Sequence, residues 1–218
     1  PIFCHQAGAA GVSAAKIEVS GIPIHPRFAE ETRSKEELRR NLGWLNDLTT
    51  VLVVGSRRVD GLQEYLTSIN TSDLPLQLAI VAGGDDDLYR WLNTVIWKHP
   101  AYLYNYVTEL PVMMQAADVL VSKAGGLVIS EALSCGIPVM MVNSIPGQET
   151  GNIAYVCSNT VGDLGRTPSE MTKMLESWLQ EDGLLLRRLS ANARGLGRPN
   201  AAYRVAEALW QAVCIREY

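Results

Sequence analysis

One short stretch constrains the fold of this chain more than any other. An apolar run at 119–121 leads into Lys123-Ala-Gly-Gly-Leu-Val-Ile-Ser-Glu131, where apolar residues recur at helical spacing after the glycine pair. This order predicts a strand that turns on Gly125 and Gly126 into a helix. The first N–H groups of such a helix point outside the sheet and attract an anion such as a diphosphate. Glu131, about one turn further on, can accept hydrogen bonds from sugar hydroxyls, so the stretch indicates a nucleotide site.

The rest of the chain alternates between short β-rich runs and helical patterns. Strands are predicted at 16–20, 50–54, 77–82, 101–107, 118–122 and 138–142. Helices are predicted at 34–41, 62–69, 88–97, 111–116, 127–135, 149–157, 169–179, 183–193 and 201–213. Capping boxes, Ser34 with Glu37 and Thr167 with Glu170, mark two of the helix starts. The alternation predicts an α/β fold with a Rossmann-like, doubly wound parallel sheet, which binds ligands beyond the carboxyl ends of its strands.

Composition excludes several classes of function. With a net charge of −4 and dispersed Lys and Arg, the 218-residue chain has no basic surface that would indicate nucleic-acid binding. The four cysteines lack C-x-x-C spacing and the three histidines are scattered, so we expect reduced thiols and no metal site. No apolar run is long enough to span a bilayer. The chain starts at Pro1 without Met, which is compatible with a fragment of a longer protein.

Several segments together resemble a known family. The segment 123–131 resembles the donor-binding signature of GT-B glycosyltransferases of the family 28 type, and Pro146-Gly-Gln-Glu149 with Asn152 resembles a segment of their lipid branch. That branch includes monogalactosyldiacylglycerol synthase and diacylglycerol glucosyltransferase. The segments 21–24, 115–118 and 136–139 agree with the same family. These enzymes have two facing Rossmann-like domains, and this chain is similar only to the carboxyl-terminal, donor-binding half.

The resemblance implies a division of the chain and a set of donor contacts. Residues 1–20 would be a remnant of the interdomain region with a first strand, and residues 21–218 would form the nucleotide-sugar domain with its carboxyl-terminal helix. The residues that the resemblance places at the UDP-sugar are Ser56, Val107, Lys123, Gly125, Gly126, Glu131, Gln148, Glu149 and Asn152.

Each of these contacts has a definite chemical role, and most have a plainer alternative. The glycines would let the diphosphate approach the backbone, or they could only allow a tight turn. Glu131 would bind the ribose hydroxyls, or it could be an exposed helical Glu. The pair at 148–149 would hold hydroxyls of the transferred hexose with Asn152 nearby, whereas Glu149 could instead cap a helix. Backbone groups around Val107 would bind the uracil base.

The sequence departs from the family pattern in the loop at 55–61, at His25, and at Leu127-Val128, where small or hydroxyl residues are common. The loop at 55–61 has fewer glycines than is usual, and its Ser56 could bond the diphosphate or line the interdomain cleft. Arg57 and Arg58 could add charge there or be solvated. His25 stands where Arg is frequent in relatives, and neutral imidazole offers a phosphate less positive charge. The acidic run at 85–87 could suggest a metal-binding D-x-D motif, but its place before a helix favours capping.

The implied reaction is the inverting transfer of a hexosyl group from a UDP-sugar to a lipid hydroxyl, with diacylglycerol as the acceptor. The catalytic base and the acceptor groove would belong to the absent amino-terminal half, so no catalytic residue is assigned. We expect no cofactor or metal, a cytoplasmic protein peripheral to the membrane, and a possible homodimer through the apolar face at 201–213. The alternatives are a separate subunit of a split GlcNAc transferase, a UDP-sugar epimerase and a non-catalytic nucleotide-binding module.

Overall fold

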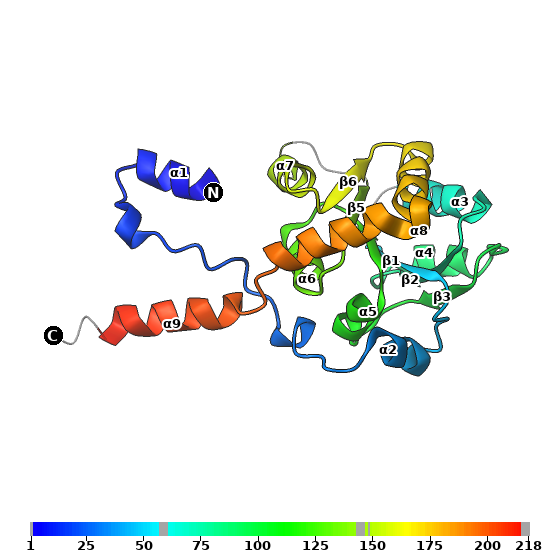
Figure 1. The fold of residues 1–218 in the computed structure, drawn as a ribbon, viewed down its shortest axis with the longest axis horizontal. Helices are drawn as coiled ribbons and strands as arrows, with labels where there is room; N and C mark the ends of the chain where they lie inside the picture. Colours follow the sequence, from blue (N-terminus) through cyan, green and yellow to red (C-terminus); the bar gives the residue numbers. More distant parts are fainter. Residues whose placement is uncertain (1, 57–60, 143–146, 148, 215–218) are drawn as a thin grey trace.

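The computed structural model describes residues 2–56, 61–142, 147 and 149–214. The predictions made for Arg57, Arg58 and Gln148 concern residues outside these ranges. Its centre is a parallel sheet of six strands in the order β3-β2-β1-β4-β5-β6 (Figure 1). The strands are β1 Thr49–Val54, β2 Leu76–Val81, β3 Ala101–Tyr104, β4 Val119–Ser122, β5 Val139–Val142 and β6 Gly162–Gly165. This strand order is that of the doubly wound Rossmann sheet, so the predicted fold class is confirmed.

The helices are α1 Ile2–Ala9, α2 Lys35–Leu42, α3 Leu62–Thr71, α4 Asp86–Leu92, α5 Leu110–Ala116, α6 Gly126–Ser134, α7 Thr150–Ser158, α8 Pro168–Leu196 and α9 Ala201–Cys214, with short 3-10 turns Ala14–Lys16 and Pro26–Phe28. Helices α2 to α8 cover both faces of the sheet, whereas α1 and α9 lie away from it (Figure 1).

Alternation along the strands divides the core into two layers. Leu52 and Leu120 pack with α2, α5 and α6 on one face, whereas Val51 and Val53 pack with α3, α4 and α8 on the other. Successive side chains of a strand point to opposite faces, and here both faces are covered. Both sides of the strands are therefore apolar, which is why the sequence shows continuous apolar runs.

The structure contradicts one predicted strand and adds two elements. Residues 17–20 pair with no described strand, and Val19 is 44% exposed, so the β-branched residues there reflect an extended segment outside the sheet. The predictions contained neither α1 nor β6. The sequence of β6, Gly-Asp-Leu-Gly, has no β-branched residue. Its Gly162 is needed for close packing, because a Cβ there would lie 1.9 Å from the carbonyl oxygen of Val139.

The helix boundaries largely follow the capping signals. Ser34 and Thr167 accept hydrogen bonds from the backbone N–H groups of Glu37 and Glu170, at 3.2 and 3.1 Å. The predicted helix at 88–97 instead covers Asp86–Leu92, since the Asp85 carboxylate caps it by accepting from two N–H groups. The helices predicted at 169–179 and 183–193 form α8 with a non-helical break at 180–183.

A buried ionic network fastens α2 to the amino end of β4. The carboxylate of Asp118 contacts Lys35 Nζ at 2.8 Å and Arg39 Nη2 at 2.5 Å. It also accepts a hydrogen bond from the Thr50 N–H at 2.8 Å, which joins it to β1. Burial raises the pKa of Asp118, but the two cations outweigh this effect and hold that pKa below its ordinary value. The 115–118 segment of the family pattern is therefore structural, at the edge of the sheet opposite the glycine turn.

Candidate functional site

The glycine turn lies at the topological switch of the sheet. Strands β1 and β4 are parallel neighbours, but β1 leads toward β2 on one side while β4 leads toward β5 on the other. At their carboxyl ends the Ser122 hydroxyl donates to the Val54 carbonyl oxygen at 3.3 Å. The chain then passes through 123–125 into α6. Ligands of doubly wound sheets bind at such a point, and the structure places the glycine turn there.

Gly125 has no evident need to be glycine for the fold. Its φ of −71° and ψ of 133° are open to any residue. A Cβ added to it would lie 3.6 Å from Val128 Cγ1 and 3.7 Å from Lys123 Cε, which are ordinary contacts. A Cβ on Gly126 would meet Ile22 Cδ1 at 3.2 Å, so that position is tighter. The turn alone therefore does not explain Gly125.

The first turn of α6 is suited to an anion. Gly125 occupies the N-cap position, where it supplies no side-chain hydrogen bond. The first N–H groups of a helix have no partner within the helix, and they carry the positive end of its dipole. A diphosphate placed beyond Gly125 would meet these groups.

Two predicted site residues form an ion pair across the turn. Lys123 Nζ lies 3.5 Å from Glu149 Oε1, and the Glu149 residue is only 3% exposed. Glu149 stands at the N-cap position of α7 but makes no side-chain capping bond. The Glu149 side chain therefore does not cap α7, and its carboxylate is turned to Lys123 instead.

Asn152 joins the same group from the first turn of α7. Its Nδ2 donates to the carbonyl oxygen of Ala124 at 2.8 Å, inside the glycine turn. The side chain also lies near Gly126, with Nδ2 3.6 Å from the position of a Cβ there. The start of α7 is thus held against the start of α6 by two polar contacts, through Glu149 and through Asn152.

Glu131 is the unusual carboxylate of the site. It lies in α6 beyond the glycine turn and is half-buried. Burial raises the pKa of Glu131 to about 7, and no described cation or hydrogen-bond donor offsets it. A half-buried carboxylate without a partner is costly, and hydroxyl donors of a ligand would relieve that cost.

Val107 and Ser56 lie at the same carboxyl edge, outside the contacts that join the other residues. The predicted strand at 101–107 ends at Tyr104, so Val107 falls in the loop between β3 and α5, where it packs against the core. Beside it, Tyr106 is 73% exposed, an aromatic surface that the sequence interpretation did not single out. Ser56 follows β1, and its Cα lies 3.4 Å from the position of a Cβ on Gly83.

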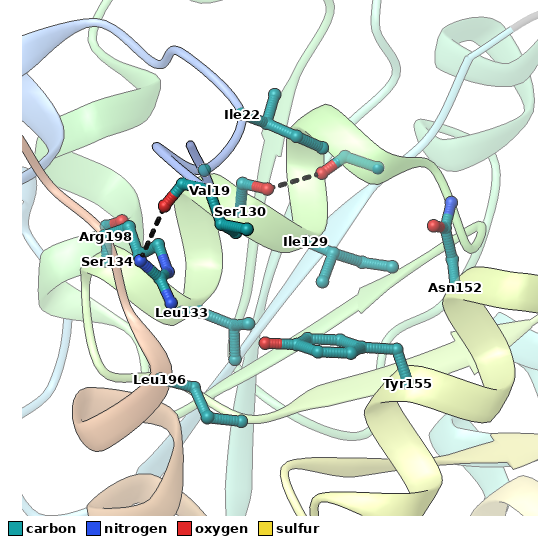
Figure 2. Close-up of a pocket in the computed structure, with 12 residues that line it drawn as sticks. Val19, Ile22, Ile129, Ser130, Leu133, Ser134, Asn152, Tyr155, Leu196 and Arg198 are labelled. Carbon is teal, nitrogen blue, oxygen red and sulfur yellow. Dashed lines mark hydrogen bonds between the residues drawn. The ribbon is translucent and has the colours of Figure 1, made fainter. Parts of the chain in front are cut away.

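A cavity that the sequence did not reveal adjoins the glycine turn. It has a volume of about 290 Å³ and lies between α6, α7, the segment 19–22 and the end of α8 (Figure 2). Gly126 and Asn152 line it as well as the turn. Ile129 and Leu133 form its α6 wall, and Tyr155 of α7 crosses it. Apolar spacing in the sequence predicts that α6 is a helix, but not that one of its faces borders a cavity.

Other titratable residues have structural roles. The His25 Nδ1 accepts a hydrogen bond from the Arg27 N–H at 3.2 Å and so caps a 3-10 turn.

In the ranges that the structure describes, no group of three or more His, Cys, Asp or Glu side chains could hold a metal ion. Within those ranges, too, every helix is too short or too polar to cross a bilayer.

Comparison with known proteins gives this geometry a context. The family description "Glycosyl transferases group 1" matches residues 34–196. Monogalactosyldiacylglycerol synthase 1, chloroplastic, of Arabidopsis thaliana is 31% identical over 216 residues, which are 95% of this chain and 40% of that protein. The chain thus spans about two fifths of the length of the curated relatives it matches.

Two solved structures have a similar fold. Anabaena HepE in complex with UDP aligns with a TM-score of 0.66 at 17% identity, over 95% of this chain and 61% of HepE. The C-terminal domain of the group 1 protein LpcC from Francisella tularensis aligns with a TM-score of 0.60 at 12% identity, over 80% of this chain and 96% of that domain. The predicted fold, the carboxyl-terminal half of a GT-B glycosyltransferase, is confirmed, as is the similarity to monogalactosyldiacylglycerol synthases.

Proposed function

Because this chain belongs to the group 1 family of glycosyl transferases, we propose that it is the donor half of an enzyme that transfers a hexosyl group from a UDP-sugar to a lipid. One observation carries the proposal. The glycine turn at the switch of the sheet is held against Glu149 and Asn152 of the next helix, so an anion site and a set of sugar-binding groups lie side by side.

The donor is assigned to these groups as follows. The diphosphate lies beyond Gly125, where it meets the first N–H groups of α6. Glu131 accepts hydrogen bonds from the ribose hydroxyls, and its half-buried carboxylate supports this role. The backbone around Val107 binds uracil, and Ser56 contacts the diphosphate or the cleft. The UDP in the HepE structure supports a uridine nucleotide as ligand of this fold.

The sugar is assigned to the start of α7. Asn152 and Glu149 present amide and carboxylate groups next to the glycine turn, and Gln148 belongs to the same segment. Adjacent hydroxyls of a hexose need both donors and acceptors, which an amide supplies together. Lys123 lies between the sugar and diphosphate positions, where it orients Glu149 and adds positive charge.

The acceptor is assigned from the relatives. Their names describe synthases of monogalactosyldiacylglycerol, so a diacylglycerol hydroxyl is the proposed acceptor. The transfer inverts the anomeric carbon: a base outside this chain deprotonates the hydroxyl while UDP leaves on the opposite side. The leaving diphosphate is stabilised by helix-terminal N–H groups, so the proposed reaction needs neither a metal nor a cofactor. The proposed location is the cytoplasmic face of a membrane, with a possible homodimer through α9.

Calorimetric titration of the chain with UDP and then with UDP-galactose, UDP-glucose and UDP-GlcNAc tests the proposal. We expect UDP to bind, and the preferred sugar to strengthen binding through Glu149 and Asn152. The Glu131→Ala variant should bind UDP about 10- to 150-fold more weakly, the equivalent of a charge-assisted hydrogen bond. Glu176→Ala, on the exposed face of α8, is the matched control and should bind as the wild type does. A folded wild type that does not bind UDP would overturn the assignment.

A further inference from the structure

The cavity beside the glycine turn is shaped by two close contacts, one between backbone segments and one between backbone and a side chain. A Cβ on Gly197 would lie 2.5 Å from the Leu133 carbonyl oxygen, so the end of α8 passes directly over the end of α6. A Cβ on Gly21 would lie 2.8 Å from Arg198 Cδ, and Arg198 Nη1 donates to the Val19 carbonyl oxygen at 3.1 Å. These contacts fix the segment 19–22 as a wall (Figure 2). The cavity is therefore defined by tight backbone packing.

The lining of the cavity is apolar with isolated hydroxyls. Ile22, Ile129, Leu133 and Leu196 present aliphatic carbon to it. Figure 2 shows the Tyr155 ring crossing the cavity with its hydroxyl directed toward Leu133 and Leu196. Among the described residues that hydroxyl has no hydrogen-bond partner. The Ser134 Oγ, also in the lining, is buried and likewise lacks a partner in the described structure.

These features suit an amphiphile with an aliphatic chain and a hydrogen-bond acceptor. A cavity of about 150 Å³ can hold benzene, so about 290 Å³ holds on the order of ten carbon atoms. A buried hydroxyl without a partner, such as that of Ser134, is rare and costly, and the partly exposed Tyr155 hydroxyl is a further donor that the carbonyl oxygen of an ester would satisfy. A metal ion or a polar sugar would leave the aliphatic walls unused.

We propose that this cavity binds an acyl chain of the acceptor lipid, with the Tyr155 hydroxyl donating to the ester carbonyl. The inference rests on the proposed function. Gly126 and Asn152 border both the cavity and the donor position, so a chain held here brings its glycerol hydroxyl toward the sugar. The curated relatives are named for a product that carries ester-linked acyl chains. The carboxyl-terminal half thus contributes to acceptor binding as well as to donor binding.

Binding of monoacylglycerols of increasing chain length, measured by calorimetry below their micelle concentrations, tests this proposal. The hexanoyl, octanoyl, decanoyl and dodecanoyl compounds should bind about fourfold more tightly for each added methylene until the cavity is filled. Beyond that length the affinity should stop rising. An affinity that keeps rising would indicate partition onto an exposed apolar surface such as α9 and would overturn the proposal.

Matched variants locate the binding. Leu196→Trp fills the cavity from α8 and should abolish binding of the decanoyl compound, whereas Leu184→Trp, on the exposed side of the same helix, should not. Tyr155→Phe removes only the hydroxyl. It should weaken binding of the decanoyl ester about 2- to 10-fold and leave binding of the corresponding alkyl ether unchanged. Equal weakening of ester and ether would overturn the role of Tyr155.

Titration with UDP separates this proposal from the proposed function. All three variants should bind UDP as the wild type does, which also shows that they are folded. Loss of acylglycerol binding with UDP binding intact supports the acyl cavity. A wild type that binds UDP but shows no length-dependent acylglycerol binding overturns the cavity proposal alone, whereas absence of UDP binding overturns the donor assignment.

Discussion

Lys123 and Glu149 come from different connections of the sheet, yet their charged atoms lie 3.5 Å apart. Lys123 follows β4 and Glu149 precedes α7, so the pair joins the glycine turn to the segment that follows β5. The Lys123 side chain is 25% exposed and that of Glu149 only 4%. The pair therefore holds a buried carboxylate in place at the mouth of the site, and neutralises it.

Removing the cation of this pair should destabilise the fold. In Lys123→Met the Glu149 carboxylate keeps its burial but loses the ammonium group at 3.5 Å, which should cost about 1–3 kcal/mol in urea unfolding. Lys173→Met, on an exposed face of α8, should change the free energy of unfolding by less than about 0.5 kcal/mol. Adding Glu149→Gln to Lys123→Met should restore part of the loss, and an additive second loss would contradict the coupling.

Gly125→Ala should separate ligand binding from stability. The φ of −71° and the ordinary contacts at 3.6 and 3.7 Å accept a methyl group, so the free energy of unfolding should change by less than about 1 kcal/mol, since the weaker N-cap and the stiffer unfolded chain act in opposite directions. The methyl group would stand where the diphosphate meets the backbone, and UDP affinity should fall at least about tenfold. Gly195→Ala, in α8 with open space around it, should leave UDP binding unchanged. Full UDP affinity in Gly125→Ala would favour the plain-turn interpretation.

The pH dependence of UDP binding should report on Glu131. Burial raises the pKa of Glu131 from 4.5 to about 7, and only the charged carboxylate accepts two hydrogen bonds from ribose. The affinity of the wild type for UDP should therefore rise as pH increases through 7. Glu131→Gln has no carboxylate to ionise, so it should lack this rise in UDP affinity. The ratio of wild-type to variant affinity for UDP should therefore grow between pH 6 and pH 8. A constant ratio would place the ribose elsewhere.

Glu131 should also make folding stability depend on pH, but stability should fall with rising pH where UDP affinity rises. Because its pKa is higher in the folded chain than in the unfolded chain, Glu131 binds protons more tightly when folded, and stability falls as pH rises from 4.5 to about 7. Above pH 7, Glu131→Gln should be more stable than the wild type without ligand, by about 1 kcal/mol given the partial exposure of the side chain. Thermal unfolding at pH 5 and pH 8 measures this difference.

Asp118 should matter for stability and not for donor binding. Asp118→Asn leaves Arg39 buried with a weakened partner and should cost about 3–5 kcal/mol. Asp73→Asn is the matched control: its pair with Lys98 lies on the surface, with Asp73 96% exposed, and its loss should leave the urea midpoint nearly unchanged. The pKa of Asp118 is lowered in the fold, so its contribution is present above pH 4 and is lost as pH falls further. An equal cost for both variants would contradict the burial argument.

Local signals in the sequence predicted most of the fold. The strands that became β1 to β5 are apolar runs, and the caps at Ser34 and Thr167 work as their spacing indicates. The false strand at 16–20 and the missed β6 show the limit of such signals. Whether a short segment joins a sheet depends on a neighbouring strand, as it does for Gly162 against Val139, and this is a tertiary property.

The site was predictable to the extent that it follows from single segments. A glycine turn after an apolar strand points to an anion site, and a carboxylate one turn later points to hydroxyl groups. The pairing of Lys123 with Glu149 and the bond from Asn152 to Ala124 depend on where two connections meet in space. The cavity was beyond prediction, since it exists only because Gly21 and Gly197 allow distant segments to cross closely.

The crossing of Gly21 and Arg198 also has a mechanical consequence. The segments that lead to α1 and to α9 both leave the sheet domain at this point, and both helices project away from it (Figure 1). Residues 17–20 belong to no strand and, within α9, only Ala201 is buried, so no strand pairing resists their rotation about the crossing. The two segments are instead tied to each other by side chains, since Arg198 donates to the Val19 carbonyl oxygen and Arg204 pairs with Glu18 at 3.0 Å, so the segment that walls the cavity is also the anchor of α9.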